Sequence, residues 1–341
     1  MAPNPTVVEV TRRNRVESAH RGMAAVVDDR GRMIFSIGDT TAEVFPRSAV
    51  KPIQALAMVA SGAAAHFGAT DAEIALACGS HVGSPAHVAT AESLLRKAGH
   101  DARALECGAH WPLDEAESRA LAARGEAPSP LHNNCSGKHA GFICLASFRG
   151  HDVTGYTRPD HPAMQEVTAA LADVTTAALK TANAGTDGCS IPAFAIPLNA
   201  LAWGFARLGT GQGLAKPAAH AAGRIRAAIA ACPLMLSGAG RFDTRVAEAC
   251  GQAILVKSGA EGVACAAIPE ARLGIAVKID DGAGRAATAT MAALLLRFAG
   301  DWLRDRAEAR AILEEFARPV LRNWNGVEVG CLRPTGILGG E

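Results

Sequence analysis

Arg47-Ser-Ala-Val-Lys-Pro52 opens the stretch of sequence that decides the fold. Proline is tolerated in the first turn of a helix but not in its interior. The apolar residues that follow, between Ile53 and Val59, recur at helical spacing. We therefore predict that a helix begins at about Arg47 or Ser48. Ser48 and Lys51 then lie one turn apart on the same face, with the serine hydroxyl at the positive end of the helix.

Strand patterns lie toward both ends of the chain, on either side of a mainly helical stretch from about Gly62 to Met235. Asp28-Asp-Arg-Gly31 is a turn signal, so the runs that flank it should pair as an antiparallel hairpin. The predicted strands are Thr6–Val10, Met23–Val27, Met33–Ile37, Ala253–Val256 and Leu273–Ile279. The predicted helices include Asp71–Cys78, Pro85–Ala98, one after Lys138, His161–Ala178 and Pro217–Ala231. Ala286–Phe298 and Trp302–Phe316 should be the helices that close the chain.

This order predicts an α/β protein of the α+β type, in which helices flank an antiparallel sheet and a helical insert separates the strands. Residues 1–60 and 236–341 would form a sheet-containing lobe, and residues 61–235 a mainly helical lobe. No repeat or flexible linker separates them. We therefore expect residues 1–341 to act as a single catalytic unit.

The bulk composition excludes several classes of function. A net charge of +1 and an aromatic content of 4% predict no nucleic-acid or membrane-surface partner. No apolar run approaches the roughly 20 residues that cross a bilayer. The first residues contain no continuous apolar stretch, so no signal peptide is expected. The nine cysteines are then expected to be reduced thiols of a cytoplasmic protein.

Lysine is scarce, because only seven of the thirty-four basic side chains are lysines. Three of them, Lys51, Lys138 and Lys257, stand beside small, nucleophilic or metal-binding residues. A desolvated lysine can become a neutral amine that acts as a base or a ligand, whereas arginine stays charged. The pattern therefore indicates positions that need an amine. Nucleotide bias with lysines left at random is the alternative interpretation.

Two further motifs contain a serine or lysine beside glycine. In Gly79-Ser80-His-Val-Gly83-Ser84 the serine is either a catalytic group or a cap of the helix that follows. Lys257-Ser-Gly259 comes directly after a predicted buried strand. Lys257 therefore either lines a cleft at the end of that strand or is a solvated surface lysine.

His132-Asn-Asn-Cys-Ser-Gly-Lys-His139 concentrates metal-binding and proton-active side chains within eight residues. Asp187-Gly-Cys189 supplies a second cysteine beside a carboxylate. Spacing alone suggests a zinc site of Cys135, Cys189 and either His132 or His139, with a fourth position open. A redox-inert cysteine in a loop is the alternative, since no C-x-x-C pair is present.

Taken together, these motifs resemble those of the class 3 (rhizobial-type, thermolabile) L-asparaginases. The resemblance covers nearly the whole chain and implies a fold similar to the serine β-lactamases and penicillin-binding proteins. The matching motifs are Arg47-Ser-Ala-Val-Lys-Pro52, Cys78-Gly-Ser-His81, His132-Asn-Asn-Cys-Ser-Gly-Lys-His-Ala-Gly141, Thr186-Asp-Gly-Cys189, Gly240-Arg-Phe-Asp243 and Lys257-Ser-Gly-Ala-Glu-Gly262.

The resemblance implies a catalytic site with two serine–lysine tandems. Ser48 would be the nucleophile and Lys51 its base. Ser80 and Lys257 would form the second pair, which assists proton transfer and deacylation. Lys278, one strand later, could take the place of Lys257.

The resemblance also implies a zinc ion held by Cys135, Lys138 and Cys189, which replaces the histidine ligand suggested by spacing. His139 and Asp187 would then orient the ligands and water. It further implies a homodimer.

The predicted activity is hydrolysis of the side-chain amide of L-asparagine through an acyl-enzyme on Ser48. Arg47 is expected to bind the substrate α-carboxylate. Asp187, with the zinc region, is expected to bind the α-amino end, and His139 is also a substrate-binding candidate. A β-lactam or peptide hydrolase with the same serine–lysine machinery is one alternative, and a non-catalytic zinc-dependent amino-acid sensor is another.

Overall fold

The computed structural model describes residues 3–180 and 184–338, which form two compact units. The first unit contains the chain up to Ala49, Ile196–Gln212 and the chain from Ala253 onward. The second contains Val50–Ala195 and Gly213–Gln252. The predicted boundaries at residues 60 and 236 differ from these, and Ile196–Gln212, which the prediction placed in the helical lobe, belongs to the sheet-containing unit. That the chain acts as one catalytic unit stays a prediction.

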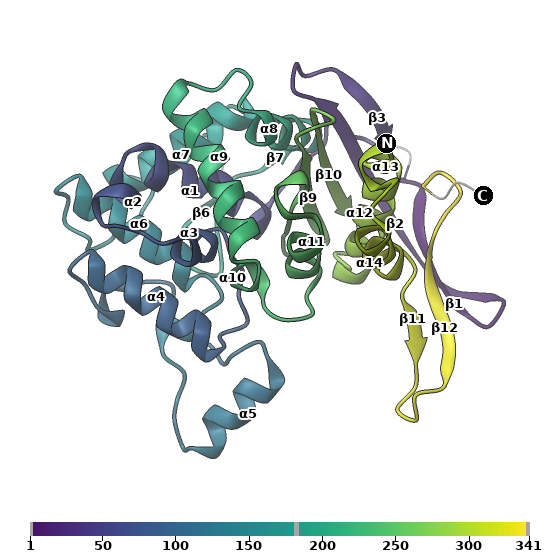
Figure 1. Cartoon of the computed structure of the whole chain (residues 1–341), viewed down its shortest axis with the longest axis horizontal. Helices are drawn as coiled ribbons and strands as arrows, with labels where there is room; N and C mark the ends of the chain where they lie inside the picture. Colours follow the sequence, from purple (N-terminus) through teal and green to yellow (C-terminus); the bar gives the residue numbers. More distant parts are fainter. Residues whose placement is uncertain (1–2, 181–183, 339–341) are drawn as a thin grey trace. The chain divides into compact units, whose positions relative to one another are not determined.

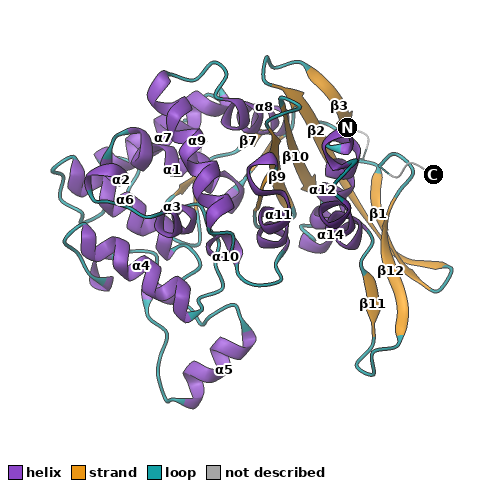
Figure 2. Ribbon diagram, viewed as in Figure 1, coloured by secondary structure: helices purple, strands orange, loops and turns teal. Residues whose placement is uncertain are grey.

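An antiparallel sheet forms the centre of the first unit, with the strand order β11-β12-β1-β2-β10-β9-β8 (Figure 2). Strand β2 is long enough to pair with both β1 and β3 along the same edge, while β10 pairs with its other edge. The predicted antiparallel sheet with flanking helices and a helical insert is therefore confirmed. The strands are β1 (Thr6–Arg12), β2 (Arg15–Asp28), β3 (Met33–Ile37), β8 (Leu255–Ser258), β9 (Val263–Ile268), β10 (Leu273–Ile279), β11 (Val320–Arg322) and β12 (Glu328–Pro334).

The β2–β3 hairpin was predicted from its turn, and the structure confirms the antiparallel pairing of Val26 with Phe35. Gly31 at the turn has a φ of 85°, which glycine adopts without steric cost. Strand β8 lies two residues later than predicted, so that Lys257 is within the strand. Strand β9 was missed, because a run of small apolar residues shows no alternation.

The chain does not close on helices as the sequence suggested. Strands β11 and β12 follow the last helix and form the yellow hairpin of Figure 1. Strand β12 pairs with β1 near the other end of the chain, with Val8 opposite Pro334 and Val10 opposite Leu332. The prediction failed because this strand is specified by a partner more than 300 residues away and not by its own pattern.

Helices cover both faces of this sheet. Helix α8 (Leu198–Thr210) packs on β10 at Gly274, where a side-chain Cβ would overlap the backbone of Ala202 and Ala206. The next residue, Ile275, faces the opposite side of the sheet. It pairs with Val26 of β2, and Val26 pairs on its other edge with Phe35 of β3, so the three side chains share that side. Phe35 contacts Phe298 of α12 (Gly284–Phe298), with ring centroids 5.6 Å apart. Helices α8 and α12 therefore lie on opposite faces.

The second unit is mainly helical and is built around α1 (Lys51–Ala60), whose residues are buried at eight of ten positions. A 3₁₀ turn, η1 (Arg47–Val50), leads into it, so the helical segment begins at Arg47 as predicted. Helix α1 packs against α6, α7 and α9. The helices of this unit are α2 (Ala63–His66), α3 (Asp71–Ala77), α4 (Pro85–Lys97), α5 (Glu115–Ala123), α6 (Ser136–Phe148), α7 (Pro162–Thr175), α9 (Lys216–Ala231), α10 (Leu234–Ser237) and α11 (Phe242–Cys250).

Short elements complete the two units. The first unit also contains α13 (Gly300–Leu303), α14 (Ala307–Ala317) and the strand pair β4 (Glu43–Val44) with β7 (Ile196–Pro197). The second contains the pair β5 (Gly185–Thr186) with β6 (Pro192–Ala193). The remaining 3₁₀ turns are η2 (Ala102–Ala104), η3 (Pro130–His132) and η5 (Gly251–Ala253). Among the described residues, no helix combines the length and the apolar character needed to cross a bilayer.

Gly274→Ala is expected to lower the free energy of unfolding by about 3 kcal/mol or more, because α8 must move away from the sheet to admit a methyl group. Thermal and urea unfolding measure the change. Gly223→Ala in α9 is the matched control, since a Cβ there meets no atom within 4 Å. That variant should be unchanged or more stable by up to about 1 kcal/mol, because alanine favours a helix interior. Equal behaviour of the two variants would contradict this account of the α8 packing.

Candidate active site and thiol–amine cluster

Lys51 is the first residue of α1, and only 1% of its surface is exposed. Its Nζ donates hydrogen bonds to two backbone carbonyl oxygens, that of Gly79 at 2.6 Å and that of Asn134 at 3.1 Å. Buried polar groups need such partners, because an unpaired amine in the protein interior is unfavourable. The amine thereby joins the two loops that contain Ser80 and Cys135.

Glycine is required at two positions of these motifs because other backbone segments pass close by. A Cβ at Gly79 would overlap the carbonyl oxygen of Met235 in α10. The next residue, Ser80, donates its backbone N–H to the carbonyl of Leu236 at 2.8 Å. A Cβ at Gly137 would lie 2.6 Å from the carbonyl oxygen of Leu76. The glycines therefore allow α10 and α3 to approach the loops closely.

The hydroxyl of Ser80 is buried and has no hydrogen-bond partner within the described parts of the chain. By its sequence pattern, this serine is either a catalytic group or the cap of the helix that begins at Pro85. The cap of α4 is Ser84, whose hydroxyl lies 2.6 Å from Nδ1 of His87. Ser80 is therefore not a cap, and its orphaned hydroxyl is available for chemistry.

Cys135, Lys138 and Cys189 form a buried cluster of two thiols and one amine in the second unit, with 2 to 5% of each residue exposed. Nζ of Lys138 lies 3.0 Å from Sγ of Cys189. Cys135 hydrogen-bonds to Cys189 and also to Lys51. The structure thus brings together the three residues that the family resemblance implied as zinc ligands.

Proton sharing within this cluster shifts the pKa values of its members. The hydrogen bond from Cys189 lowers the pKa of Cys135 well below its usual value against the effect of burial, and the charges of Lys138 and Lys51 add to this. The same hydrogen bond raises the pKa of Cys189. Burial acts to lower the pKa of Lys138, but the two neighbouring sulfur atoms raise it overall. The thiol pair therefore favours one shared negative charge, which the ammonium group of Lys138 balances.

Sulfur and nitrogen donors of this kind fit a zinc ion, which prefers thiolate and nitrogen ligands. The alternative set of Cys135, Cys189 and a histidine does not form. Among residues 3–180 and 184–338, no three His, Cys, Asp or Glu side chains lie close enough together to hold a metal ion. Nδ1 of His132 instead accepts the backbone N–H of Ser129 at 3.0 Å. A site on this loop therefore needs the lysine amine as a ligand.

Hydrogen bonds that the sequence analysis missed hold the loop of Cys135 in place. Oδ1 of Asn133 accepts the N–H of Cys135 at 2.8 Å, and its Nδ2 donates to the carbonyl of Cys107 at 2.9 Å. Nδ1 of His81 accepts the N–H of Gly83 at 3.1 Å, so its Nε2–H donates to the Ser136 hydroxyl at 2.8 Å. His81 therefore connects the Ser80 loop with the first residue of α6.

His139 is fully buried, and its Nδ1 lies 2.6 Å from the hydroxyl of Tyr156. That hydroxyl accepts the N–H of Glu106 at 3.0 Å, which leaves its own proton for Nδ1. Burial, followed by the charges of Lys138 and Lys51, lowers the pKa of His139 well below its usual value. The ring is therefore neutral with its proton on Nε2, which has no partner within the described chain. Tyr156 is the single tyrosine of the sequence, a signal that could have drawn attention to it.

Asp187 is half-buried in a tight turn, where its backbone carbonyl accepts the N–H of Ser190 at 2.9 Å. Ser190 has a φ of 74°, which is uncommon for a residue other than glycine. The charge of Asp187 contributes to the raised pKa of Lys138. The carboxylate of this turn therefore acts electrostatically on the thiol–amine cluster.

Ser48 and Lys257 belong to the first unit. Both Arg47 and Ser48 are half-buried, and Arg47 has a φ of 50°, a left-handed conformation that is rare outside glycine. Lys257 is fully buried, and its Nζ donates to the carbonyl of Ser258 at 2.7 Å. A Cβ at Gly259 would lie 2.6 Å from the carbonyl of Pro46. The end of β8 therefore passes directly beside the turn that contains Ser48.

Lys278 is the rival of Lys257 for the second lysine. It is half-buried on β10 and donates to the carbonyl of Glu261. Burial lowers the pKa of its amine. Lys257, in contrast, is fully buried. It lies two residues before Gly259, where β8 passes close to the backbone of Pro46.

The sequence matches the family model of L-asparaginase II over residues 8–334. The chain belongs to the L-asparaginase II family. The members of this family are amidohydrolase enzymes. The prediction that the chain belongs to an L-asparaginase family of amidohydrolases is therefore confirmed. No significant match was found among curated proteins.

Solved structures that match this chain include Mglu in its native form in 4.3 M NaCl, at 17% identity and a TM-score of 0.37. That match covers 83% of this chain and 61% of the Mglu chain. Mglu in its glutamate form matches at 17% identity, 83% and 60% coverage, and a TM-score of 0.36. This L-asparaginase II family member thus spans about three fifths of the length of Mglu. A β-lactamase from Mycobacterium bovis matches at 15% identity, 87% and 95% coverage, and a TM-score of 0.26. At these scores the family membership rests on the sequence match.

Tyr156→Phe is expected to lower the free energy of unfolding by about 1–3 kcal/mol, because it leaves the N–H of Glu106 and Nδ1 of His139 without their partner. Denaturant unfolding measures the change. Thr290→Val is the matched control, since the Thr290 hydroxyl is buried without a partner in the described chain. Removing it should be neutral or stabilising. A Tyr156→Phe protein as stable as wild type would show that these hydrogen bonds do not contribute to the stability of the fold.

Proposed function

We propose that this protein is an L-asparaginase that hydrolyses the side-chain amide of L-asparagine through an acyl-enzyme on Ser48. The proposal rests on membership of the L-asparaginase II family together with one observation, the buried amine of Lys51. Its Nζ donates to two backbone carbonyl oxygens and also hydrogen-bonds to Cys135. Burial disfavours the charged form of an amine, and a neutral amine keeps a lone pair that can receive a proton.

In the proposed reaction the Ser48 oxygen attacks the side-chain carbonyl carbon of asparagine, while Lys51 accepts the serine proton. Backbone N–H groups at the start of the helical segment stabilise the negative charge on the carbonyl oxygen. The protonated Lys51 returns its proton to the leaving amine, and ammonia departs. A water molecule then hydrolyses the β-aspartyl ester, which releases aspartate and restores the serine.

Ser80 and Lys257 are proposed as the second tandem, which assists proton transfer and deacylation. The orphaned Ser80 hydroxyl and the complete burial of Lys257 support these roles. Full burial favours Lys257 over Lys278, because a half-exposed amine is more easily solvated. Arg47 is proposed to bind the substrate α-carboxylate.

Zinc is proposed as the cofactor, which Cys135, Lys138 and Cys189 would hold, and when bound it would supply a Lewis acid in the region proposed to recognise the α-amino end of the substrate. The amine and both thiols must lose their protons to act as ligands. Asp187 and His139 are proposed to orient water and substrate there, since Asp187 acts on Lys138 and Nε2 of His139 has no described partner. The homodimer and the cytoplasmic location also stay predictions.

Ser48→Ala is expected to lower the rate of ammonia release from asparagine by about a thousandfold or more, because the attacking oxygen is removed. Lys51→Arg should be comparably inactive, since arginine cannot accept the proton. Ser36→Ala on the exposed face of β3 is the control and should keep wild-type activity. Rapid quenching with asparagine followed by peptide mass spectrometry should locate the acyl group on Ser48. An acyl group on Ser80 instead, with Ser48→Ala active, would overturn the assignment.

Removal of zinc by a chelator is expected to raise KM for asparagine, or to lower the Tm, more than it lowers kcat. Cys189→Ser should lose bound zinc in elemental analysis, because one of three proposed ligands is weakened. Cys232→Ser, outside the cluster, should keep it. A complete loss of kcat that zinc restores, with asparagine binding intact, would instead make the metal the hydrolytic centre.

A further inference from the structure

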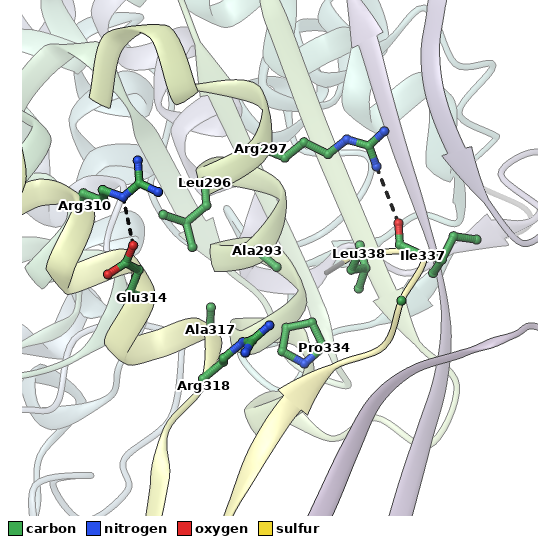
Figure 3. A pocket seen from close by; sticks show the side chains of 11 residues that line it. Ala293, Leu296, Arg297, Arg310, Glu314, Ala317, Arg318, Pro334, Ile337 and Leu338 are labelled. Atoms are coloured by element: carbon green, nitrogen blue, oxygen red, sulfur yellow. Dashed lines mark hydrogen bonds and ion pairs between the residues drawn. The ribbon is translucent and has the colours of Figure 1, made fainter. Parts of the chain in front are cut away.

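A cavity in the first unit is lined by none of the residues proposed for catalysis. It has a volume of about 960 Å³ and is bordered by α12, α14 and the segment that follows β12 (Figure 3). Small-molecule sites in proteins commonly have volumes of about 300–1,000 Å³. The cavity is therefore large enough to hold a metabolite.

The floor of this cavity is apolar. Ala293 of α12, Ala317 of α14 and Leu338 are buried, with 7%, 3% and 4% of their surfaces exposed. Leu296 and Pro334 add aliphatic surface beside them (Figure 3). Such a floor favours a ligand with an apolar body, because contact with it removes apolar surface from water.

Three arginines and one glutamate surround the floor: Arg297, Arg310, Arg318 and Glu314. Arg297 is held in place, because its guanidinium lies 4.4 Å from the ring centroid of Phe35 and donates to the carbonyl of Ile337. Nε of Arg310 is paired with Glu314 at 2.9 Å. The side chain of Arg318 has no hydrogen bond or ion pair within the described chain.

The cavity thus carries two positive charges in excess, although the net charge of the whole chain is only +1. A guanidinium offers a planar fork of donors that matches a carboxylate or a phosphate. A neutral ligand would give the guanidinium of Arg318 no charged partner, and a small polar anion would leave the apolar floor in water.

We propose that this cavity binds a small organic anion, with its apolar body on the floor and its carboxylate or phosphate group at the guanidinium of Arg318. The site is independent of the proposed asparaginase chemistry. Its ligand chemistry differs from that of asparagine, whose side chain is polar.

Binding can be measured by isothermal titration calorimetry on the full-length protein, with octanoate and octyl phosphate as probes. Both should bind saturably at one site per chain, and more weakly as ionic strength rises. Octan-1-ol and inorganic phosphate, which each lack one half of the proposed ligand, should bind at least about tenfold more weakly. The stronger of the two anions identifies whether carboxylate or phosphate is preferred.

Arg318→Gln should weaken octanoate binding by about tenfold, since a charge-assisted hydrogen bond is lost. Arg318→Lys should restore much of it. Arg304→Gln is the matched control: it makes the same change at an exposed arginine of the first unit outside the cavity, paired with Asp301. Ala293→Phe should fill the floor and weaken binding, and ammonia release from asparagine reports that the variants are folded.

Three results would each overturn the proposal. They are an absence of saturable binding to wild type, equal losses of octanoate affinity in the two Gln variants, and octan-1-ol binding as tightly as octanoate.

Discussion

A lysine amine in a protein interior must find acceptors for its protons, and Lys51 finds them in the backbone carbonyls of Gly79 and Asn134. These two hydrogen bonds determine where the Ser80 loop and the Cys135 loop meet the start of α1. Side-chain acceptors could rotate away, whereas backbone carbonyls are held by the surrounding fold. The arrangement of the second unit around its candidate chemistry therefore depends on one buried amine.

The glycines of the motifs serve the same arrangement by permitting close approach of the backbone. Gly79 allows α10 to pass beside the Ser80 loop, and Gly137 allows α3 to reach the first turn of α6. Gly259 has the same role in the first unit, where it lets the end of β8 pass beside Pro46. At each of these positions an added Cβ would lie within 3.0 Å of a backbone carbonyl oxygen of the neighbouring segment. Glycine beside a catalytic or metal-binding candidate is thus a packing requirement in this protein.

The thiol–amine cluster and the arginine-lined cavity use charge in opposite ways. The charges at Cys135 and Lys138 are buried and balance each other. A metal ion can replace the protons of such a thiol and amine when it binds them. Around the cavity of α12 and α14 the guanidinium of Arg318 is exposed and has no described partner. The buried thiol–amine cluster suits a tightly bound cofactor, whereas the exposed arginine suits a ligand that binds reversibly.

The sequence alone determined the local features: the helical segment that begins at Arg47, the β2–β3 hairpin and the motifs that identify the asparaginase family. Each depends on neighbouring residues, such as Pro52 in the first turn or the glycine at the turn after Asp28. The tertiary structure alone decided the pairing of β12 with β1, the return of α8 to the sheet, and the partners of Lys51, His81 and His139. These depend on residues tens to hundreds of positions apart, whose proximity follows from packing of the whole chain and leaves no periodic pattern in the sequence.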